Sequence, residues 1–254
     1  MVCLLLVCRL MKKFFPASFL FYLLLVIGPG GDQVFGAAKH FPGVLTYRVR
    51  KGDSLWLIAH RYGVTVEELA RVNKIEDPSL LREGRELRIT MANYDYFDKH
   101  LQVKPKVKLR DWKYIVIHHS ATDTGNSKRF DYFHRKIRHM PRGMAYHFVI
   151  GNGKGLGDGD IELGSRWTLQ QPGGHVRQNK YNNIALGICL VGNSEKNLPT
   201  KKQIASLIDL VRYLQLKFSI PRGRVLGHRE VPGERTKCPG RLFPLRSIRS
   251  KILP

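Results

Sequence analysis

The sequence predicts a mixed α/β domain, with a mixed sheet flanked by helices, preceded by a small βααβ module. Residues 105–250 contain short apolar runs typical of strands, at 114–118, 146–150 and 186–191, together with one long amphipathic helical pattern. Residues 47–89 contain two helical patterns enclosed by two strand patterns. The chain has 254 residues and is 43% hydrophobic, which is enough for folded cores in two modules.

The first residues form a targeting segment. Lys12 and Lys13 precede an apolar run from Phe14 to Ile27, which is short for a membrane span and typical of a secretory signal. We expect cleavage near residues 36–38. Residues 1–37 are therefore assigned to a signal peptide, and the mature protein is expected to be secreted, periplasmic or associated with the cell wall.

Alternatives to a cleaved signal peptide concern the start of the chain and its membrane attachment. Met11 is a second possible start, because residues 1–10 add apolar sequence ahead of the lysine pair. An uncleaved anchor is the alternative fate of the apolar run. A lipoprotein is disfavoured, because Cys8 follows Leu6 and Val7 and lacks the small residue that usually precedes a lipidated cysteine.

Residues 44–90 form the predicted N-terminal module. Gly52 permits a tight turn after the first strand, and Asp53 or Ser54 can then cap a helix. Thr65 is the predicted N-cap of a second helix, with a capping-box glutamate three residues later. A closing strand completes the βααβ order.

This module resembles the LysM domains, which bind glycans containing N-acetylglucosamine. The resemblance implies that sugar contacts come from the turn before the first helix and from the loop after the second. The candidate glycan-binding residues are Gly52, Asp53, Ser54, Leu55, Ile75, Asp77, Pro78 and Leu80. A small scaffold without a ligand is the alternative.

Residues 91–110 are predicted to be a basic linker between the two modules. The segment has no clear helical or strand period and is rich in lysine. We therefore expect it to be charged and extended.

Residues 111–254 form the predicted C-terminal domain. The clearest helix runs from about residue 201 to 217, with Thr200 and Gln203 as a capping box and one apolar face to lie on the sheet. The glycines of residues 151–159 match no nucleotide-binding fingerprint and indicate a flexible hairpin turn. A short strand is expected just before His228.

Three residues in this domain have the chemistry of a catalytic zinc site. His118 ends a strand, and His228 is followed within ten residues by Cys238. Two imidazoles and one thiolate leave a fourth tetrahedral position open for water, unlike a closed structural zinc site. His119 would be the ligand if the strand register differed by one residue. Cys238 could also be a nucleophile paired with a histidine.

Together these motifs resemble the zinc-dependent N-acetylmuramoyl-L-alanine amidases. That family also contains an amidase-type phage lysozyme and the peptidoglycan recognition proteins. The resemblance covers residues 105–250 and favours His118 over His119. It implies one Zn²⁺ per chain, held by His118, His228 and Cys238. It also implies hydrolysis of the amide between the lactyl group of N-acetylmuramic acid and the L-alanine of the stem peptide.

The resemblance also implies roles for the residues around the metal. Tyr146 would donate its hydroxyl to the oxyanion. Thr236 occupies a position that is lysine in some relatives, and it brings a donor without positive charge. His175 and Asn182 match positions that contact substrate. Cys189 stands where some relatives have a glutamate and the phage-lysozyme type has cysteine, so no general base is assigned.

The cysteine content and the net charge limit the disulfides and the binding partners that we expect. We expect no disulfide between Cys189 and Cys238, because the first lies in an apolar strand run and the second is a metal ligand. The formal charge of +23 suits anionic polymers of the cell envelope, including peptidoglycan. Nucleic acid is not expected for a secreted chain, and a monomer is expected.

Two other functional classes remain as alternatives. Some relatives recognise peptidoglycan without cutting it, typically after losing a zinc ligand, but all three ligands are present here. A glycan hydrolase that uses paired carboxylates is disfavoured, because no acidic pair stands out among the 20 acidic residues.

Overall fold

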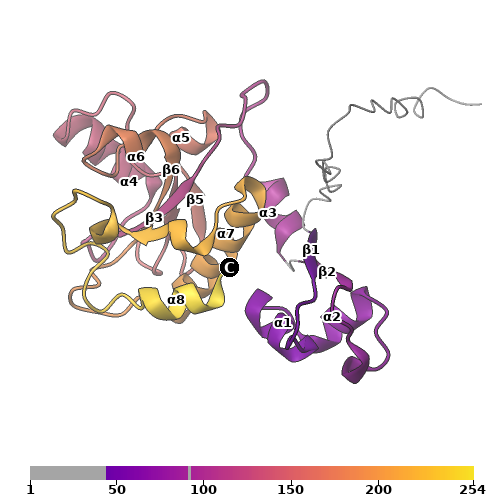
Figure 1. The fold of residues 1–254 in the computed structure, drawn as a ribbon. Helices are drawn as coiled ribbons and strands as arrows, with labels where there is room; N and C mark the ends of the chain where they lie inside the picture. Colours follow the sequence, from indigo (N-terminus) through magenta and orange to yellow (C-terminus); the bar gives the residue numbers. More distant parts are fainter. Residues whose placement is uncertain (1–43, 91–92) are drawn as a thin grey trace, which may run out of the picture. The chain divides into compact units, whose positions relative to one another are not determined.

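Figure 1 shows the computed structural model of the protein, which describes residues 44–90 and 93–254. The predicted signal peptide and its cleavage site lie outside the described residues. All described residues belong to one compact unit of the chain. None of the helices in these described ranges is long and apolar enough to cross a membrane.

The N-terminal module has the predicted βααβ order. Strands β1 and β2 pair antiparallel, and Leu55, Leu69 and Leu87 are among the residues of its buried core. A short 3-10 turn lies in the loop before β2. The elements are β1 (Val44–Arg48), α1 (Leu55–Tyr62), α2 (Val66–Val72), η1 (Pro78–Leu80) and β2 (Glu86–Thr90).

Side-chain caps begin both helices of this module. The Ser54 hydroxyl accepts a hydrogen bond from the Leu57 amide at 3.1 Å, so Ser54 rather than Asp53 is the cap of α1. The Thr65 hydroxyl accepts one from the Glu68 amide at 3.0 Å, as predicted. Such caps satisfy amide groups that the first turn of a helix leaves without partners.

The prediction of an extended linker is wrong for residues 94–100, which form helix α3 (Tyr94–His100). Tyr94 and Phe97 are buried, and their ring centroids lie 5.0 and 5.5 Å from that of Tyr213 in helix α7 (Lys201–Phe218). Asp98 accepts a hydrogen bond from Lys217 at 2.6 Å. Two aromatic residues three positions apart form one buried side of this helix, and the charged residues Asp95, Asp98 and Lys99 between and beside them obscured this pattern in the sequence.

The C-terminal domain contains a mixed five-stranded sheet in the order β5-β4-β6-β3-β7. Strand β3 pairs in parallel with both β6 and β7, β4 pairs in parallel with β6, and β5 alone is antiparallel. This arrangement confirms the predicted α/β class. The strands are β3 (Tyr114–His119), β4 (Phe148–Ile150), β5 (Ile161–Leu163), β6 (Ala185–Leu190) and β7 (Val225–Gly227).

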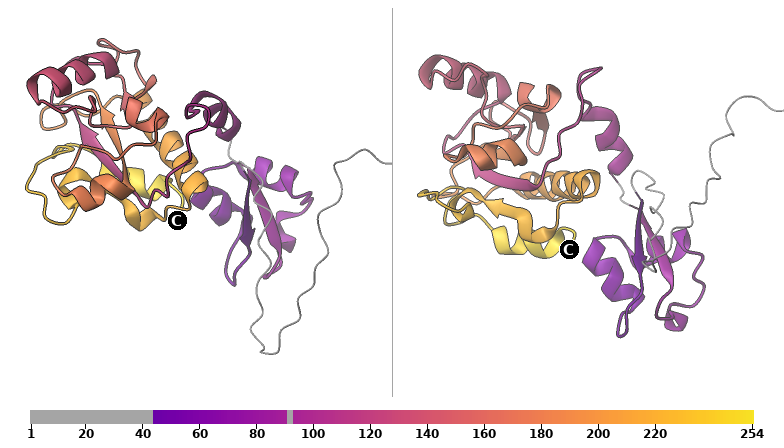
Figure 2. Two further views of the ribbon diagram at one scale, coloured as in Figure 1. Left: turned by 90° about the horizontal axis from the view of Figure 1, so that it is seen from above. Right: turned by 45° about the horizontal axis from the view of Figure 1, so that its top comes forward.

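Helices surround this sheet, and α7 is the longest of the described elements (Figure 2). Its predicted capping box is present, since the Thr200 hydroxyl accepts from the Gln203 amide at 2.9 Å and the Gln203 side chain accepts in return at 3.2 Å. The other helical segments are α4 (Ser127–Tyr132), the π-helical η2 (Phe133–Ile137), α5 (Ser165–Thr168), α6 (Asn179–Ile184), η3 (Arg222–Arg224), η4 (His228–Glu230) and α8 (Leu245–Lys251).

The second predicted strand is shorter than expected. Regular strand structure begins at Phe148 rather than at residue 146, although the His147 amide still donates to Gly187 in β6 at 2.9 Å. The glycine-rich segment after β4 connects it to β5 and closes on itself, with the Gly151 amide donating to Asp160 at 2.9 Å. The predicted hairpin turn is therefore confirmed.

Candidate metal centre

Alternation along β3 assigns its side chains to two faces of the sheet. Ile115 and Ile117 share a buried core with Leu214 of α7. Val116 belongs to a separate cluster on the opposite face. Because side chains in a strand alternate between faces, His118 shares the face of Val116. Helix α7 therefore covers one face of the sheet, and His118 lies on the other face.

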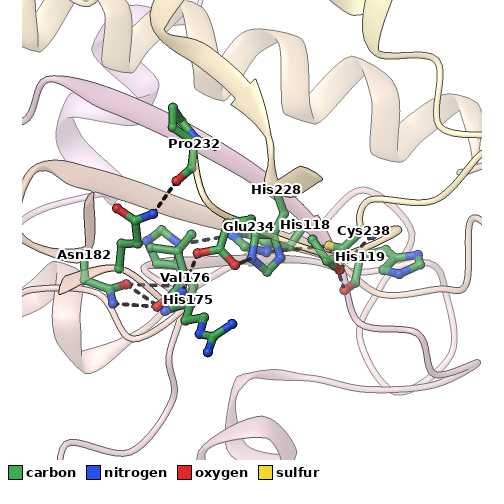
Figure 3. Close-up of polar contacts among 12 residues, drawn as sticks. His118, His119, His175, Val176, Asn182, His228, Pro232, Glu234 and Cys238 are labelled. Carbon is green, nitrogen blue, oxygen red and sulfur yellow. Dashed lines mark hydrogen bonds and ion pairs between the residues drawn. The ribbon is translucent and has the colours of Figure 1, made fainter. Parts of the chain in front are cut away.

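His118, His228 and Cys238 come together at the carboxyl end of β3. Their ligand atoms all lie within 4.8 Å of one another. The His118 Nδ1 atom is 3.6 Å from the Cys238 sulfur, and the two imidazole centroids are 4.5 Å apart (Figure 3). Parallel pairing of β3 with β7 explains the approach, because His228 directly follows β7.

The Cys238 loop is tied to the segment that carries His228. The Arg229 amide donates to the Cys238 carbonyl oxygen at 2.8 Å. The Cys238 amide donates to the Thr236 hydroxyl oxygen at 3.1 Å, which leaves the Thr236 hydroxyl proton free to donate elsewhere. One local hydrogen-bond network thus holds the segments that carry the Cys238 thiol and the His228 imidazole.

A chain of hydrogen bonds fixes the tautomer of His118. His175 Nε2 lies 3.3 Å from the Ala185 carbonyl oxygen, which can only accept, so this nitrogen carries a proton. The Nδ1 atom of neutral His175 is therefore an acceptor, and it lies 3.1 Å from His118 Nε2. His118 must place its proton on Nε2. Its Nδ1 lone pair then faces the Cys238 sulfur.

A carboxylate does the same for His228. Glu234 Oε2 lies 3.1 Å from His228 Nε2 and accepts a hydrogen bond from it, so Nε2 carries the proton of the neutral ring and Nδ1 carries none. The Glu234 side chain is almost fully buried and also accepts from the Arg177 amide at 2.6 Å. Sequence reasoning missed Glu234. An acid six residues after a histidine ligand was the available indication, since ligating histidines usually bind a carboxylate through their second nitrogen.

His119 lies outside the cluster. Its Nδ1 accepts a hydrogen bond from the Ser194 amide at 3.0 Å. The alternative register, with His119 as the ligand, therefore does not occur in the structure.

Electrostatics around the three residues favour neutral groups in the absence of a cation. Burial lowers the pKa of His118 well below its ordinary value and also lowers that of His228. Burial raises the pKa of the Cys238 thiol to about 12. A divalent cation reverses the preference of the thiol, because it stabilises the thiolate directly. Two bare imidazole nitrogens and a thiol are donors that suit zinc.

Tyr146 borders the cluster, with its ring centroid 5.2 Å from that of His118. Burial raises the pKa of its phenol well above the ordinary value, and the nearby thiols of Cys189 and Cys238 raise it further. The hydroxyl therefore keeps its proton at neutral pH. Cys189 packs in the same side-chain cluster, one strand away from His118 in the sheet register.

The side chains of His175 and Asn182 make hydrogen bonds within the protein interior. The Asn182 side-chain oxygen accepts from the amides of His175 and Val176 at 3.0 and 3.2 Å, and its nitrogen donates to the Val176 carbonyl at 2.7 Å. Both side chains are buried. This geometry gives both residues a positioning role, because Asn182 holds the loop that carries His175 and His175 contacts His118. Substrate contact by these two residues stays a prediction.

The predicted glycan-binding residues of the N-terminal module divide by exposure. Leu55 and Ile75 are buried in the core, so their side chains are unavailable to a ligand. The Asp53 carboxylate is used internally, since it accepts from the Tyr47 hydroxyl and pairs with Arg61 at 3.3 Å. The exposed members are Gly52, Ser54, Asp77, Pro78 and Leu80. Trp56, which the sequence reasoning left out, is also exposed and stacks on His60.

Comparison with known proteins gives matches over both modules. The family described as N-acetylmuramoyl-L-alanine amidase matches residues 108–241. The LysM domain family matches residues 47–90.

The relatives of this chain include a peptidoglycan-recognition protein and an amidase. Peptidoglycan-recognition protein LB of Drosophila melanogaster is 34% identical over 141 residues, which are 51% of this chain and 56% of that protein. The N-acetylmuramoyl-L-alanine amidase XlyA of Bacillus subtilis is 42% identical over 64 residues, 25% of this chain and 18% of that protein. The chain spans about half the length of the first curated relatives it matches, 48% and 56%.

A solved structure gives a similar match. The N-acetylmuramoyl-L-alanine amidase LysC from Clostridium intestinale has 33% sequence identity with this chain and a TM-score of 0.48. The match covers 56% of this chain and 85% of that one.

Proposed function

Because the chain belongs to the N-acetylmuramoyl-L-alanine amidase family and carries a LysM domain, we propose that it is a secreted zinc-dependent peptidoglycan hydrolase. The bond cleaved is the amide between the lactyl group of N-acetylmuramic acid and the L-alanine of the stem peptide. The observation that carries the proposal is the cluster of His118, His228 and Cys238, in which both imidazoles present a bare Nδ1 atom.

The metal contributes one part of the chemistry. A zinc ion held by these three residues supplies Lewis acidity, which polarises a carbonyl group and lowers the pKa of water. The remaining requirement is to stabilise negative charge on the amide oxygen as the tetrahedral intermediate forms.

Two hydroxyl groups of the chain meet this requirement. Tyr146 keeps its proton because burial raises the pKa of its phenol, so it donates a hydrogen bond to the oxyanion. The Thr236 hydroxyl accepts from the Cys238 amide and has its proton left to donate. Both donors are neutral, and the site therefore stabilises the oxyanion with dipoles rather than with a side-chain cation.

The LysM domain and the charge of the chain keep it on its substrate. Gly52, Ser54, Asp77, Pro78 and Leu80 form the exposed part of the proposed glycan contact. The net charge of +23 adds attraction to anionic envelope polymers, which should weaken as salt is added. In this proposal the protein acts as a monomer outside the cytoplasm, and the signal peptide directs its export.

A second candidate function is recognition of peptidoglycan without cleavage. It is favoured by the lack of a side-chain cation at Thr236, together with the likeness to a peptidoglycan-recognition protein. The retention of three candidate zinc ligands favours the hydrolase.

One experiment distinguishes these functions. Purified peptidoglycan is digested with the predicted mature chain, residues 38–254, with and without a zinc chelator, and the products are identified by mass spectrometry. We expect chelator-sensitive release of intact stem peptides with free L-alanine amines. Binding without cleavage would assign the chain to recognition, and sugar fragments with intact lactyl amides would exclude the amidase reaction.

The Cys238→Ser variant provides the internal control. It removes the thiolate ligand, so we expect loss of both zinc and cleavage, while binding through the LysM domain is retained. Cleavage at the normal rate by this variant would contradict the assigned metal centre.

A further inference from the structure

The segment formed by α4 and η2 has an exposed apolar face. Tyr132, Phe133 and Ile137 are exposed to 63%, 46% and 58%. On the inner side, Phe130 is buried and His134 is half-buried. We call the surface formed by Tyr132, Phe133 and Ile137 the α4–η2 face. Figures 1 and 2 show α4 at the outer edge of the C-terminal domain, away from α8.

Basic side chains surround this face. Between residues 127 and 142 the sequence has one carboxylate, Asp131, which pairs with Arg135 at 2.7 Å. The segment therefore has a large excess of positive charge next to its exposed apolar side chains. Its exposed cations are Lys128, Arg129, Arg135, Lys136, Arg138 and Arg142.

The combination of positive charge and exposed apolar side chains limits which kind of partner can bind the α4–η2 face. A second copy of this face would bring the same cations together and be repelled. An anionic polysaccharide would satisfy the cations, yet it offers nothing apolar to an exposed isoleucine. Interfacial helices with aromatic and aliphatic side chains beside lysine and arginine bind lipid surfaces that contain anionic headgroups.

We propose that the α4–η2 face binds the surface of an anionic lipid bilayer. Tyr132, Phe133 and Ile137 enter the boundary between headgroups and acyl chains, and the surrounding cations contact lipid phosphates. This binding is separate from the proposed amide hydrolysis and does not depend on it.

The position of the face also has a consequence for the metal centre. His134, on the inner side of the same segment, has its ring centroid 5.7 Å from that of Tyr146. Its Nδ1 is 2.7 Å from the Phe130 carbonyl oxygen, which fixes the ring to the helix. A bilayer bound to the outer side of α4 and η2 therefore lies next to the wall of the candidate active site. This further consequence rests on the proposed hydrolase function: cleavage would then be directed to the peptidoglycan nearest the membrane.

The test measures binding of the predicted mature chain, residues 38–254, to sedimented vesicles. One set of vesicles contains phosphatidylcholine with phosphatidylglycerol, and the other contains phosphatidylcholine alone. We expect binding to the anionic vesicles that exceeds binding to the neutral ones at least tenfold. The combined variant Tyr132→Ser, Phe133→Ser and Ile137→Ser should lose at least tenfold in vesicle binding, because all three side chains are exposed and contribute little to the core.

Matched control variants distinguish binding through this face from nonspecific hydrophobic binding and from nonspecific attraction by the net positive charge. Leu198→Ser removes another exposed apolar side chain, 67% exposed, and should leave vesicle binding unchanged. Lys136→Glu with Arg138→Glu should weaken binding strongly, whereas Lys196→Glu with Arg246→Glu, also exposed cations, should have a smaller effect. Circular dichroism and zinc content of each variant establish that the fold is intact.

Several outcomes would overturn the proposal. The wild-type protein could fail to bind anionic vesicles, or the triple variant could bind them as well as the wild type. If the triple variant instead loses binding to purified peptidoglycan but keeps vesicle binding, the face contacts glycan or peptide. Charge variants that matter while the triple variant does not would identify a surface for soluble polyanions.

Discussion

At the scale of single residues, the site depends on hydrogen bonds that determine which atom of each side chain is available. The carbonyl of Ala185 fixes His175, His175 fixes His118, and Glu234 fixes His228. Both imidazoles then present Nδ1 to the same point. The proton remains on Tyr146 for a different reason, because burial disfavours the charged phenolate.

The first prediction concerns Tyr146. Tyr146→Phe removes the hydroxyl that we propose donates to the oxyanion and leaves the ring in place beside His118. Turnover should fall by about 10²–10³-fold while zinc content stays at one per chain. Steady-state kinetics and metal analysis on the same preparation measure both, and normal hydrolysis by the variant would show that the role is wrong.

The second prediction concerns Glu234. Glu234→Gln keeps the size of the side chain but replaces the charged acceptor of the His228 proton. Zinc affinity should fall by about 10–100-fold, as is usual when a partner of a metal-bound histidine is lost. Competition with a fluorescent chelator measures this affinity.

Glu195→Gln is the matched control for that measurement. The Glu195 carboxylate accepts from the Arg241 amide at 2.7 Å and does not bind a histidine ligand. Its zinc affinity should equal that of the wild type. Equal affinities in both variants would leave Glu234 with a purely structural role.

At the scale of elements, the site depends on the sheet and on the turns that follow its strands. Strand β3 brings His118 next to β7 and β6, so residues more than a hundred positions apart meet at one edge. Helix α7 fills the opposite face, and its capping box begins it where the sequence predicted. Helix α3 packs on α7 and links the segment after the LysM domain to the C-terminal core.

The third prediction tests the packing of α3. Phe97→Ala removes a buried ring and should lower the free energy of unfolding by about 3 kcal/mol. Tyr96→Ala, at a neighbouring position that is 59% exposed, should change it by less than about 0.5 kcal/mol. Denaturant unfolding of the two variants makes the comparison. Equal stabilities would show that α3 is not packed in solution.

At the scale of the whole molecule, the metal-free protein contains several buried histidines that are neutral. Burial lowers the pKa of His175 from 6.5 to about 3 and lowers those of His118 and His147 well below 6.5. A depressed folded pKa means that the unfolded chain binds protons more readily below pH 6.5. The stability contributed by these neutral histidines is complete above pH 6.5 and is lost as the pH falls toward the folded values.

The fourth prediction follows from this loss of stability at low pH. In the presence of a chelator, the free energy of unfolding should fall by roughly 3 kcal/mol or more between pH 6.5 and 4.5, since one pKa unit corresponds to about 1.4 kcal/mol. Carboxylates begin to take up protons toward pH 4.5, so the part of the fall between pH 6.5 and 5.5 is the part that belongs to the histidines. Denaturant unfolding at several pH values measures it, and a flat profile would contradict the assigned neutral histidines.

The sequence by itself determined the order of modules, the α/β class and the three candidate ligands. Periodicity and capping are local properties, so the long helix, the strand that carries His118 and the cap at Thr65 could all be predicted from neighbouring residues. The local motifs around His118, His228 and Cys238 likewise identified the donor atoms without any knowledge of their distances.

Only the tertiary structure decided how those residues are used. The Glu234 carboxylate and the His175 ring act through contacts between distant segments, which no local pattern encodes. Burial makes the side chains of Leu55 and Ile75 unavailable for the proposed glycan contacts. Packing against α7 made a helix of a segment that was predicted to be a linker. The physical reason is common to all of these. Burial and hydrogen-bond partnership depend on which surfaces meet, and that is fixed only when the sheet and its helices are assembled.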